Sequence, residues 1–241
     1  MNRLQITRST GILFISLVIL SNIPYILLTQ TFEYDDILRE PVDYVLTQFD
    51  AGGVALILTW FTFGLTALLL MPATIVLHSV IARKDTPYLL AATGMGAFSG
   101  ILQAVGLMRW VFVIPILASI QVDPSTSEAT RAAVAIAYQI VHQYGGVVIG
   151  EQLGQTLLIG WTTGVGIAML QSPLVKPWVA WWGLLTTPLL LLGQSELLST
   201  VIPGLPIVET TPIGFILWEV WILLIGISLL RVPKRRLGIS V

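Results

Sequence analysis

Long apolar runs are the feature that most restricts how this chain can fold. An α-helix needs about 20 apolar residues to cross the hydrocarbon core of a bilayer, and runs of that length recur between residues 11 and 230. Charged residues make up 10 % of the chain, whereas a soluble globular domain carries about 25 %. Because so few charges do not keep a compact apolar chain in water, we predict an integral membrane protein.

The apolar runs predict an all-α fold, a polytopic membrane bundle of six transmembrane helices. The expected spans are about 11–28, 53–80, 88–109, 145–170, 178–199 and 213–230. The first span follows Arg3 and Arg8, as the apolar part of a signal peptide would. No small-residue cleavage site precedes the acids at 33–36, so we expect this span to be retained. Residues 1–241 are then a single integral membrane domain.

The basic residues predict the orientation of these spans. Lys and Arg are enriched in cytoplasmic loops, and an even number of spans places both termini on one side. That side would carry most of the basic residues: Arg3, Arg8, Arg83, Lys84, Lys176, Arg231, Lys234, Arg235 and Arg236. The other side would carry Arg39 and Arg131, with Arg109 at its border. We therefore predict that both termini are cytoplasmic.

The segment between the third and fourth spans does not fit a plain crossing. Residues 129–171 are apolar over about twice the length that a bilayer core needs. Pro115 and the pair Gly145–Gly146 are the available breaking points. We expect residues 110–144 to form an apolar helical hairpin that folds over the outer face of the bundle as a cap. The alternative is two long helices that project straight out.

Composition also excludes several classes of function. The net charge of −1 gives no basic surface for DNA or RNA, and the absence of cysteine removes disulfides and thiolate metal sites. No nucleophile elbow, Walker loop or kinase motif is present. The sequence leaves the cofactor, the oligomeric state and the question of enzyme activity open.

Four ionisable residues lie inside the predicted spans and arrive at similar depth in the outer third: Arg109, Glu151, Glu196 and Glu219. A charge at bilayer depth costs about 2.5–3.5 kcal/mol, so such residues face the protein interior and pair. The simplest pair is Arg109 with Glu151, and either other glutamate can share the guanidinium. The negative excess suits proton transfer, a metal or a cationic ligand equally. The alternative is an ion-pair network that only fixes helix register.

Two further polar residues lie near this layer. His142 precedes the Gly145–Gly146 break, and a bend there would turn it over the layer. His142, Glu151 and Glu196 together form a weak candidate metal site, because no spaced ligand motif such as HExxH accompanies them. Gln155 lies one turn below Glu151 on the same helix face, where it would line a polar pocket.

Rows of small residues predict close helix packing. Gly146, Gly150 and Gly154 recur every four residues on the fourth span, and Gly96 and Gly100 do so on the third. Such rows let helix backbones approach closely in membranes. Close packing of these two spans would also bring Arg109 toward Glu151.

Several stretches resemble the bacterial multi-pass membrane family called domain of unknown function 4386. They are residues 106–118, 142–154, 177–185 and 216–230, and the most specific elements are Arg-Trp at 109–110 and His…Gly-Glu-x-Leu-Gly at 142–154. The resemblance implies a six-span protein of the bacterial cell (plasma) membrane. It implies no activity, so Arg109, His142 and Glu151 remain candidates.

Our functional hypothesis is that the protein binds or handles a small or lipid-like ligand in the polar layer beneath the hairpin. Arg109 would be an anion contact or counter-ion, with Glu151 and Glu219 as acid/base groups or cation ligands. One alternative is a membrane-embedded metal-dependent enzyme that uses His142, Glu151 and Glu196. Another is a structural or assembly subunit of the membrane. The expected partners are the lipid bilayer and this ligand, with no nucleic acid.

Overall fold

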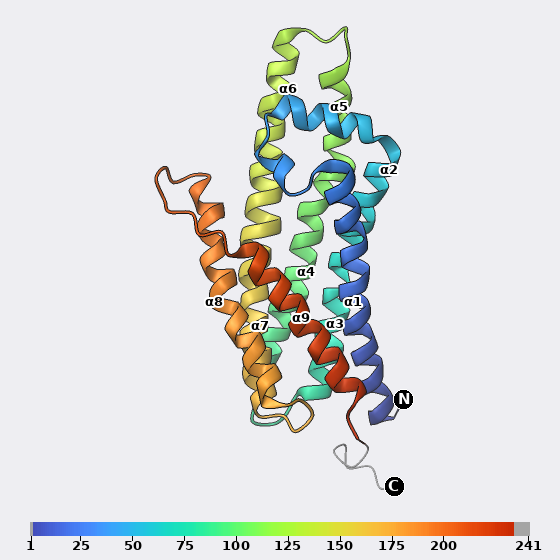
Figure 1. The fold of residues 1–241 in the computed structure, drawn as a ribbon, viewed down its shortest axis with the longest axis vertical. Coiled ribbons are helices and arrows are strands. Elements are labelled where there is room, and N and C mark those ends of the chain that lie inside the picture. Colours follow the sequence, from blue (N-terminus) through green and yellow to red (C-terminus); the bar gives the residue numbers. More distant parts are fainter. Residues whose placement is uncertain (1, 234–241) are drawn as a thin grey trace. The chain divides into compact units, whose positions relative to one another are not determined.

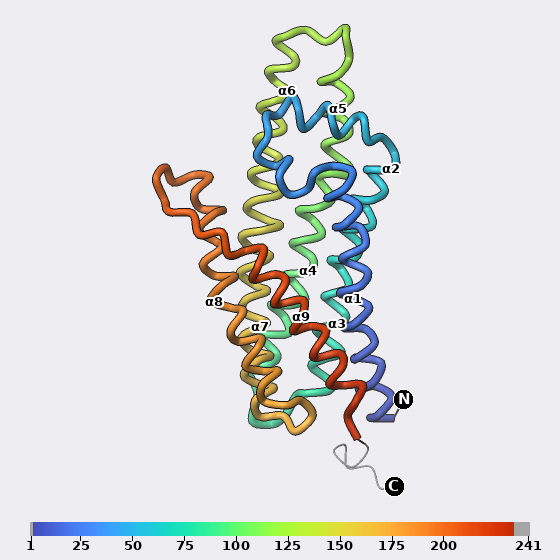
Figure 2. The backbone as a smooth tube through the Cα atoms, in the orientation of Figure 1, coloured from blue at the N-terminus to red at the C-terminus, as the bar shows by residue number. Residues whose placement is uncertain are grey.

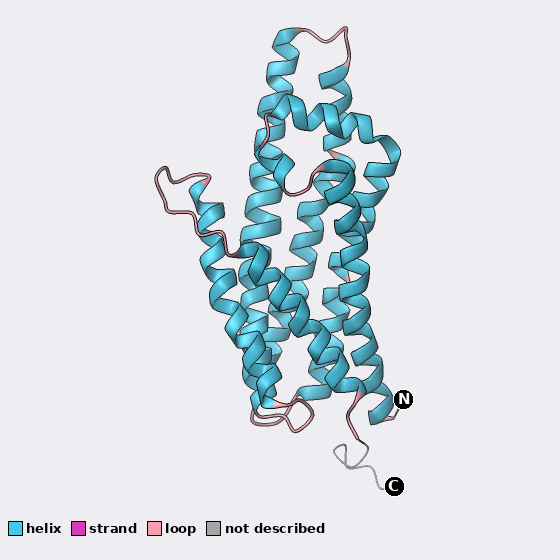
Figure 3. Cartoon of the chain, in the orientation of Figure 1, coloured by secondary structure: helices cyan, strands magenta, loops and turns pink. Residues whose placement is uncertain are grey.

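The computed structural model describes residues 2–233, in which all regular structure is helical (Figures 1 and 3). The α-helices are α1 (Arg3–Phe32), α2 (Val42–Leu68), α3 (Leu70–Ile81), α4 (Leu89–Phe112), α5 (Ile114–Val122), α6 (Glu128–Val141), α7 (Gly154–Leu170), α8 (Pro177–Ser199) and α9 (Thr211–Leu230). A short 3-10 helix, η1 (Asp36–Arg39), precedes α2, and a π-helix, η2 (His142–Leu153), joins α6 to α7.

Within residues 2–233, five continuous helical stretches are long and apolar enough to cross a membrane, judged by length and composition. They are Arg3–Phe32, Val42–Ile81, Leu89–Val122, Glu128–Leu170 and Thr211–Leu230. The predicted span at 178–199 forms a helix, α8, but it is not among the five. Its three tryptophans, paired threonines and the Gln-Ser-Glu run near its end lower its hydropathy. The fold is thus an all-helical, membrane-type bundle.

The chain divides into two compact units. The first unit comprises Met1–Ile19, Leu69–Gly100 and Gly154–Val241, and the second comprises Leu20–Leu68 and Ile101–Leu153. The helices α1 and α4 each supply residues to both units. The polar residues singled out in the sequence divide between the units. Arg109, His142 and Glu151 lie in the second unit, and the first contains Gln155, Glu196 and Glu219.

Aromatic packing forms the core of the first unit. The Trp161 ring on α7 lies 5.7 Å from that of Trp221 and 6.2 Å from that of Trp218, both on α9. The indole N–H of Trp218 donates to the hydroxyl of Thr162 at 2.9 Å. Within this unit, α8 packs against both α7 and α9 (Figure 2).

The expected hairpin at 110–144 forms in the second unit, but it does not fold over as a cap. Only Val113 separates α4 from α5, and α6 continues directly into η2. Figure 1 shows α5 and α6 extending in the directions of α4 and η2, so the straight alternative is the one observed. Ser127 caps the start of α6, since its side chain accepts a hydrogen bond from the backbone N–H of Thr130 at 3.2 Å.

The first part of α2 explains why the hairpin stays straight. Residues 42–52 lie before the predicted second span, yet they form a helix that ends in a kink at Gly53. The buried side chains of this part of α2 are Val45, Leu46 and Phe49, which share one apolar cluster with Ile114 and Ala118 of α5 and Val134 and Tyr138 of α6. One apolar face of the hairpin is therefore packed against α2, which gives it a partner without folding over.

The kink at Gly53 gives a direct test of this arrangement. Gly53 has φ 54° and ψ −149°, a conformation that side-chain-bearing residues rarely adopt, although an added Cβ there would meet no other atom. We predict that Gly53→Ala lowers the free energy of unfolding by about 1–3 kcal/mol through backbone strain alone. Gly94→Ala is the matched control, because Gly94 also has open space but lies in regular helix.

The measurement is the thermal or denaturant stability of both variants, purified in detergent. Gly94→Ala should be neutral or slightly stabilising, since alanine is the better helix former. Equal stability of the two variants would contradict the proposed kink.

Candidate functional site

Arg109 is the centre of a buried polar and aromatic cluster in the second unit. The side chain lies near the end of α4 and is only 7 % exposed. One guanidinium nitrogen, Nη1, donates to the carbonyl of Gly106, while Nε has no hydrogen-bond partner. The guanidinium carbon lies 5.3 Å from the centroid of the Trp110 ring. A cation over an indole face is stabilised by the ring quadrupole, most strongly where water is excluded.

Two stacked tryptophans form the wall beside this guanidinium. The rings of Trp60 on α2 and Trp110 on α4 lie 4.8 Å apart with an interplanar angle of 12°, and both residues are fully buried. Phe49 also stacks against Trp110, at 5.7 Å. Neither indole N–H has a hydrogen-bond partner. Buried donors are nearly always paired in proteins, so two unpaired indoles beside an unpaired Arg Nε call for a ligand or water to accept from them.

The segment between α1 and α2 adds a tyrosine to this cluster. The Tyr34 ring packs edge-on against Trp60 at 5.0 Å. Burial raises the pKa of Tyr34 well above its ordinary value, and the negative charges of Asp35 and Glu151 raise it further, whereas Arg109 lowers it. The Tyr34 hydroxyl therefore lies in the same electrostatic environment as Arg109 and Glu151.

The π-helix η2 carries both His142 and Glu151. A π-helix bonds each residue to the fifth one along and so has more residues per turn than an α-helix, about 4.4. Nine positions then make about two turns and bring His142 and Glu151 toward one face, whereas an α-helix would place them on opposite faces. The charge of Arg109 interacts with both residues. π-Helical segments are rare and frequently occur at functional sites.

The ring of His142 is stacked on a neighbouring aromatic ring, and one of its nitrogen atoms lacks a hydrogen-bond partner. The imidazole stacks on the ring of Tyr138, one turn earlier, at 5.6 Å and 13°. Its Nδ1 is buried without a hydrogen-bond partner. His142 thus adds a fourth unsatisfied polar atom to the cluster around Arg109.

Glycines allow the guanidinium to lie directly against η2. A Cβ added at Gly146 would stand 2.6 Å from both Cζ and Nη2 of Arg109, and one added at Gly106 would stand 2.6 Å from the Cα of Gly150. The backbones of α4 and η2 therefore touch at Gly106 and Gly150. This close approach places the side chain of Arg109 against η2, the helix that carries Glu151, in the same unit.

The other expected packing glycines belong to the first unit. A Cβ at Gly96 would stand 2.6 Å from the Trp161 ring and from the Thr74 side chain. The carbonyl of Gly154 accepts a hydrogen bond from the Ser99 hydroxyl at 2.8 Å. Gly100 is the last residue of the α4 part of this unit.

The remaining candidate residues also lie in the first unit. Gln155 is buried on α7, and its side-chain oxygen accepts from the amide of Gln194 on α8 at 2.7 Å. Glu196 on α8 and Glu219 on α9 are each partly buried and each has polar or electrostatic contacts. The structure thus brings together Arg109, His142 and Glu151, while a shared layer with Glu196 and Glu219 stays a prediction.

The described residues offer no assembled metal site. Between residues 2 and 233, no three His, Asp or Glu side chains lie close enough together to hold a metal ion. The atoms gathered around Arg109 are mainly N–H donors, which bind oxygen acceptors rather than cations. The set His142, Glu151 and Glu196 therefore gains no support as a metal centre.

Fold and site together define a multi-pass helical membrane protein with a buried arginine–tryptophan cluster. The model of the family Domain of unknown function (DUF4386) matches residues 9–226, and the chain belongs to this family. The comparison with curated proteins and that with solved structures gave no match. The resemblance seen in the sequence is thereby confirmed. Because the function of this family is unknown, the evidence for function comes from the site.

The contact between Arg109 and Gly146 predicts a sharp difference between neighbouring glycines. Gly146→Ala forces a methyl group into the guanidinium and should lower the free energy of unfolding by about 1–3 kcal/mol. Gly145→Ala is the control, because its nearest neighbour is the Arg109 Cδ at 3.8 Å, an ordinary contact. Stability measurements on the purified variants test this, and equal losses at the two positions would argue against the guanidinium placement.

A second prediction concerns pH and Asp35, which accepts a hydrogen bond from the Tyr25 hydroxyl at 3.3 Å. Burial raises the pKa of Asp35 above its ordinary value. A carboxyl whose pKa is higher in the folded state than in the unfolded state destabilises the folded state once the pH exceeds both of these values. This penalty is absent at pH values below the pKa of the unfolded state. Asp35→Asn should therefore raise the melting temperature at pH 7 and leave it unchanged below about pH 4. A pH-independent difference would contradict the raised pKa of Asp35.

Proposed function

We propose that this protein is a multi-pass protein of the bacterial plasma membrane that binds a small or lipid-like ligand at the Arg109 cluster. The ligand's head group would carry carboxylate, ester or phosphate oxygens. In this proposal both termini are cytoplasmic and the cluster lies in the outer third of the membrane, as the distribution of basic residues favours.

The unpaired buried donors carry this proposal. Arg109 Nε, Trp60 Nε1 and Trp110 Nε1 lack hydrogen-bond partners, and the three residues are at least nine-tenths buried. Each unsatisfied buried donor costs about 1–3 kcal/mol. A head group that supplies two or three oxygen acceptors recovers that free energy, so the cluster is selective for acceptor-rich molecules.

The surroundings of Arg109 favour an amphipathic ligand over a bare ion. Glu151 is close enough for its charge to act on Arg109, which partly offsets the positive charge of the guanidinium. The faces of Trp60, Trp110 and Phe49 provide apolar surface around the donors. Aromatic walls with a few fixed polar groups are typical of small-molecule sites.

The matched test replaces single indole N–H groups and keeps an aromatic ring. Trp60→Phe and Trp110→Phe each remove one donor of the cluster. Trp161→Phe is the control, because its indole N–H is also buried and unpaired but lies in the core of the first unit. The probe is lauric acid, whose carboxylate supplies acceptors, with dodecylamine as the cationic counterpart of equal chain length.

Binding to the detergent-purified protein is measured by native mass spectrometry. Wild type should retain laurate in preference to dodecylamine. Trp60→Phe and Trp110→Phe should each weaken retention about fivefold, the value of one hydrogen bond, and Arg109→Gln should weaken it at least tenfold. Trp161→Phe should leave retention unchanged.

The structural alternative predicts a different outcome from the same variants. If the cluster only fixes helix packing, all three Trp→Phe variants lose some thermal stability and none changes laurate retention. Equal effects of Trp60→Phe and Trp161→Phe on retention would overturn the proposal.

A further inference from the structure

A pocket of about 290 Å³ opens at the end of the first unit where α1 begins. It lies between the first turns of α1, the end of α3 and the loop that joins α7 to α8. Its polar lining includes Arg3, Thr7, Arg83 and Ser172, and its apolar lining includes Ile6 and Leu174. This pocket shares no residue with the Arg109 cluster, which belongs to the second unit.

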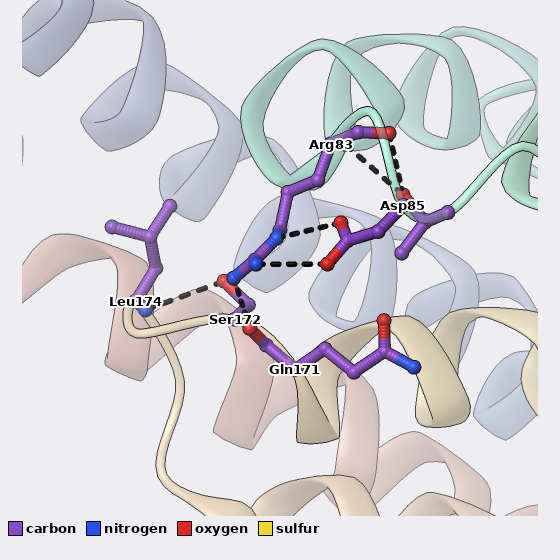
Figure 4. A network of polar contacts seen from close by, with 6 residues as sticks. Arg83, Asp85, Gln171, Ser172 and Leu174 are labelled. Atoms are coloured by element: carbon purple, nitrogen blue, oxygen red, sulfur yellow. Dashed lines mark hydrogen bonds and ion pairs between the residues drawn. The ribbon is translucent and has the colours of Figure 1, made fainter.

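Arg83 is held in place by its neighbours, as Figure 4 shows. Its Nε and Nη2 donate to the two carboxylate oxygens of Asp85, each at 2.9 Å, and its Nη1 donates to the carbonyl of Gln171. A guanidinium has five N–H groups, so two remain after these three bonds. Arg83 is thus held in a fixed position in the pocket lining, with two N–H groups that can donate to a ligand.

Positive charge is concentrated at this end of the first unit. Figure 1 shows the start of α1, the turn from α3 to α4, the loop from α7 to α8 and the end of α9 at this same end. These segments carry Arg3, Arg8, Arg83, Lys84, Lys176 and Arg231. Among the described residues of this unit, the only acid at this end is Asp85, which is engaged by Arg83. The pocket therefore faces an environment that attracts anions.

Exposed aromatic residues place this end at the level of a membrane interface. Trp178 and Trp181, in the first turns of α8, are 51 % and 55 % exposed. Tryptophans gather where lipid head groups meet the hydrocarbon core. A molecule bound in the pocket would have its polar part among the arginines and its apolar part against Ile6 and Leu174.

We propose that this pocket binds the phosphate head group of an anionic membrane phospholipid. The Arg3 guanidinium and the two remaining N–H groups of Arg83 would hold the phosphate oxygens, because arginine matches phosphate geometry. The apolar lining favours a lipid over a free phosphate ion. The glycerol backbone and first acyl carbons of a lipid can pack against Ile6 and Leu174, whereas a free phosphate ion has no apolar part.

The experiment titrates the full-length, detergent-purified protein with dioctanoyl phosphatidylglycerol, with native mass spectrometry as the readout. Dioctanoyl phosphatidylcholine tests the need for net negative charge, and glycerol 3-phosphate tests the need for acyl chains. Arg3→Gln removes one pocket charge. Arg8→Gln is the matched control, because it removes an equally exposed charge of the same helix that does not line the pocket.

Wild type should bind phosphatidylglycerol more tightly than either comparison compound. Arg3→Gln should weaken this binding about fivefold, the usual effect of one basic residue at a lipid surface, and Arg8→Gln by less than twofold. Melting temperatures confirm that both variants fold. Equal losses in the two variants, equal binding of phosphatidylcholine, or equal binding of glycerol 3-phosphate would each overturn the proposal.

Discussion

The burial of the Arg109 guanidinium is the constraint on which the second unit depends. A charge removed from water has to be compensated by its surroundings, and the groups around this guanidinium come from two segments of the sequence, α4 and η2. Gly146 leaves room for the guanidinium, the Gly106 carbonyl accepts from it, and the Trp110 ring lies beside it. The charge of Glu151 acts on it from the π-helix. Replacing any of these groups therefore alters the environment of one buried cation.

The same arrangement links packing to function. Because η2 is a π-helix, its wide turns bring His142 and Glu151 toward the face that α4 contacts at Gly150. The Trp60–Trp110 stack is fully buried, which excludes water from the indole donors. The first unit also contains unpaired buried indole N–H groups, on Trp161 and Trp221, but those of Trp60 and Trp110 are grouped with the unpaired Nε of a buried arginine. This grouping of unpaired donors is the reason to propose a ligand.

The features that could be predicted from the sequence are those that depend on the free-energy cost of placing a residue in a membrane. The apolar runs predicted the long helices, and the penalty for a buried charge together with the glycine rows predicted Arg109 near Glu151. Sequence reasoning missed Trp60 and Tyr34, because nothing in a helical pattern tells which aromatic residue from a distant segment stacks on Trp110. It also missed the helix at 42–52, which lies before the predicted second span although its buried side chains pack against the hairpin. The π-helix has no sequence rule, so the sequence predicts a bend at Gly145–Gly146, whereas the structure has a continuous π-helix there.

The most direct test of the ligand site is an NMR spectrum of the indole N–H groups. The chain has eight tryptophans, and protein labelled with ¹⁵N at the indole gives one signal for each, assigned through the Trp→Phe variants. Our account predicts that laurate shifts the signals of Trp60 and Trp110 downfield, because their N–H groups acquire acceptors, while that of Trp161 stays in place. Unchanged Trp60 and Trp110 signals at saturating laurate, or an equal shift of Trp161, would contradict it.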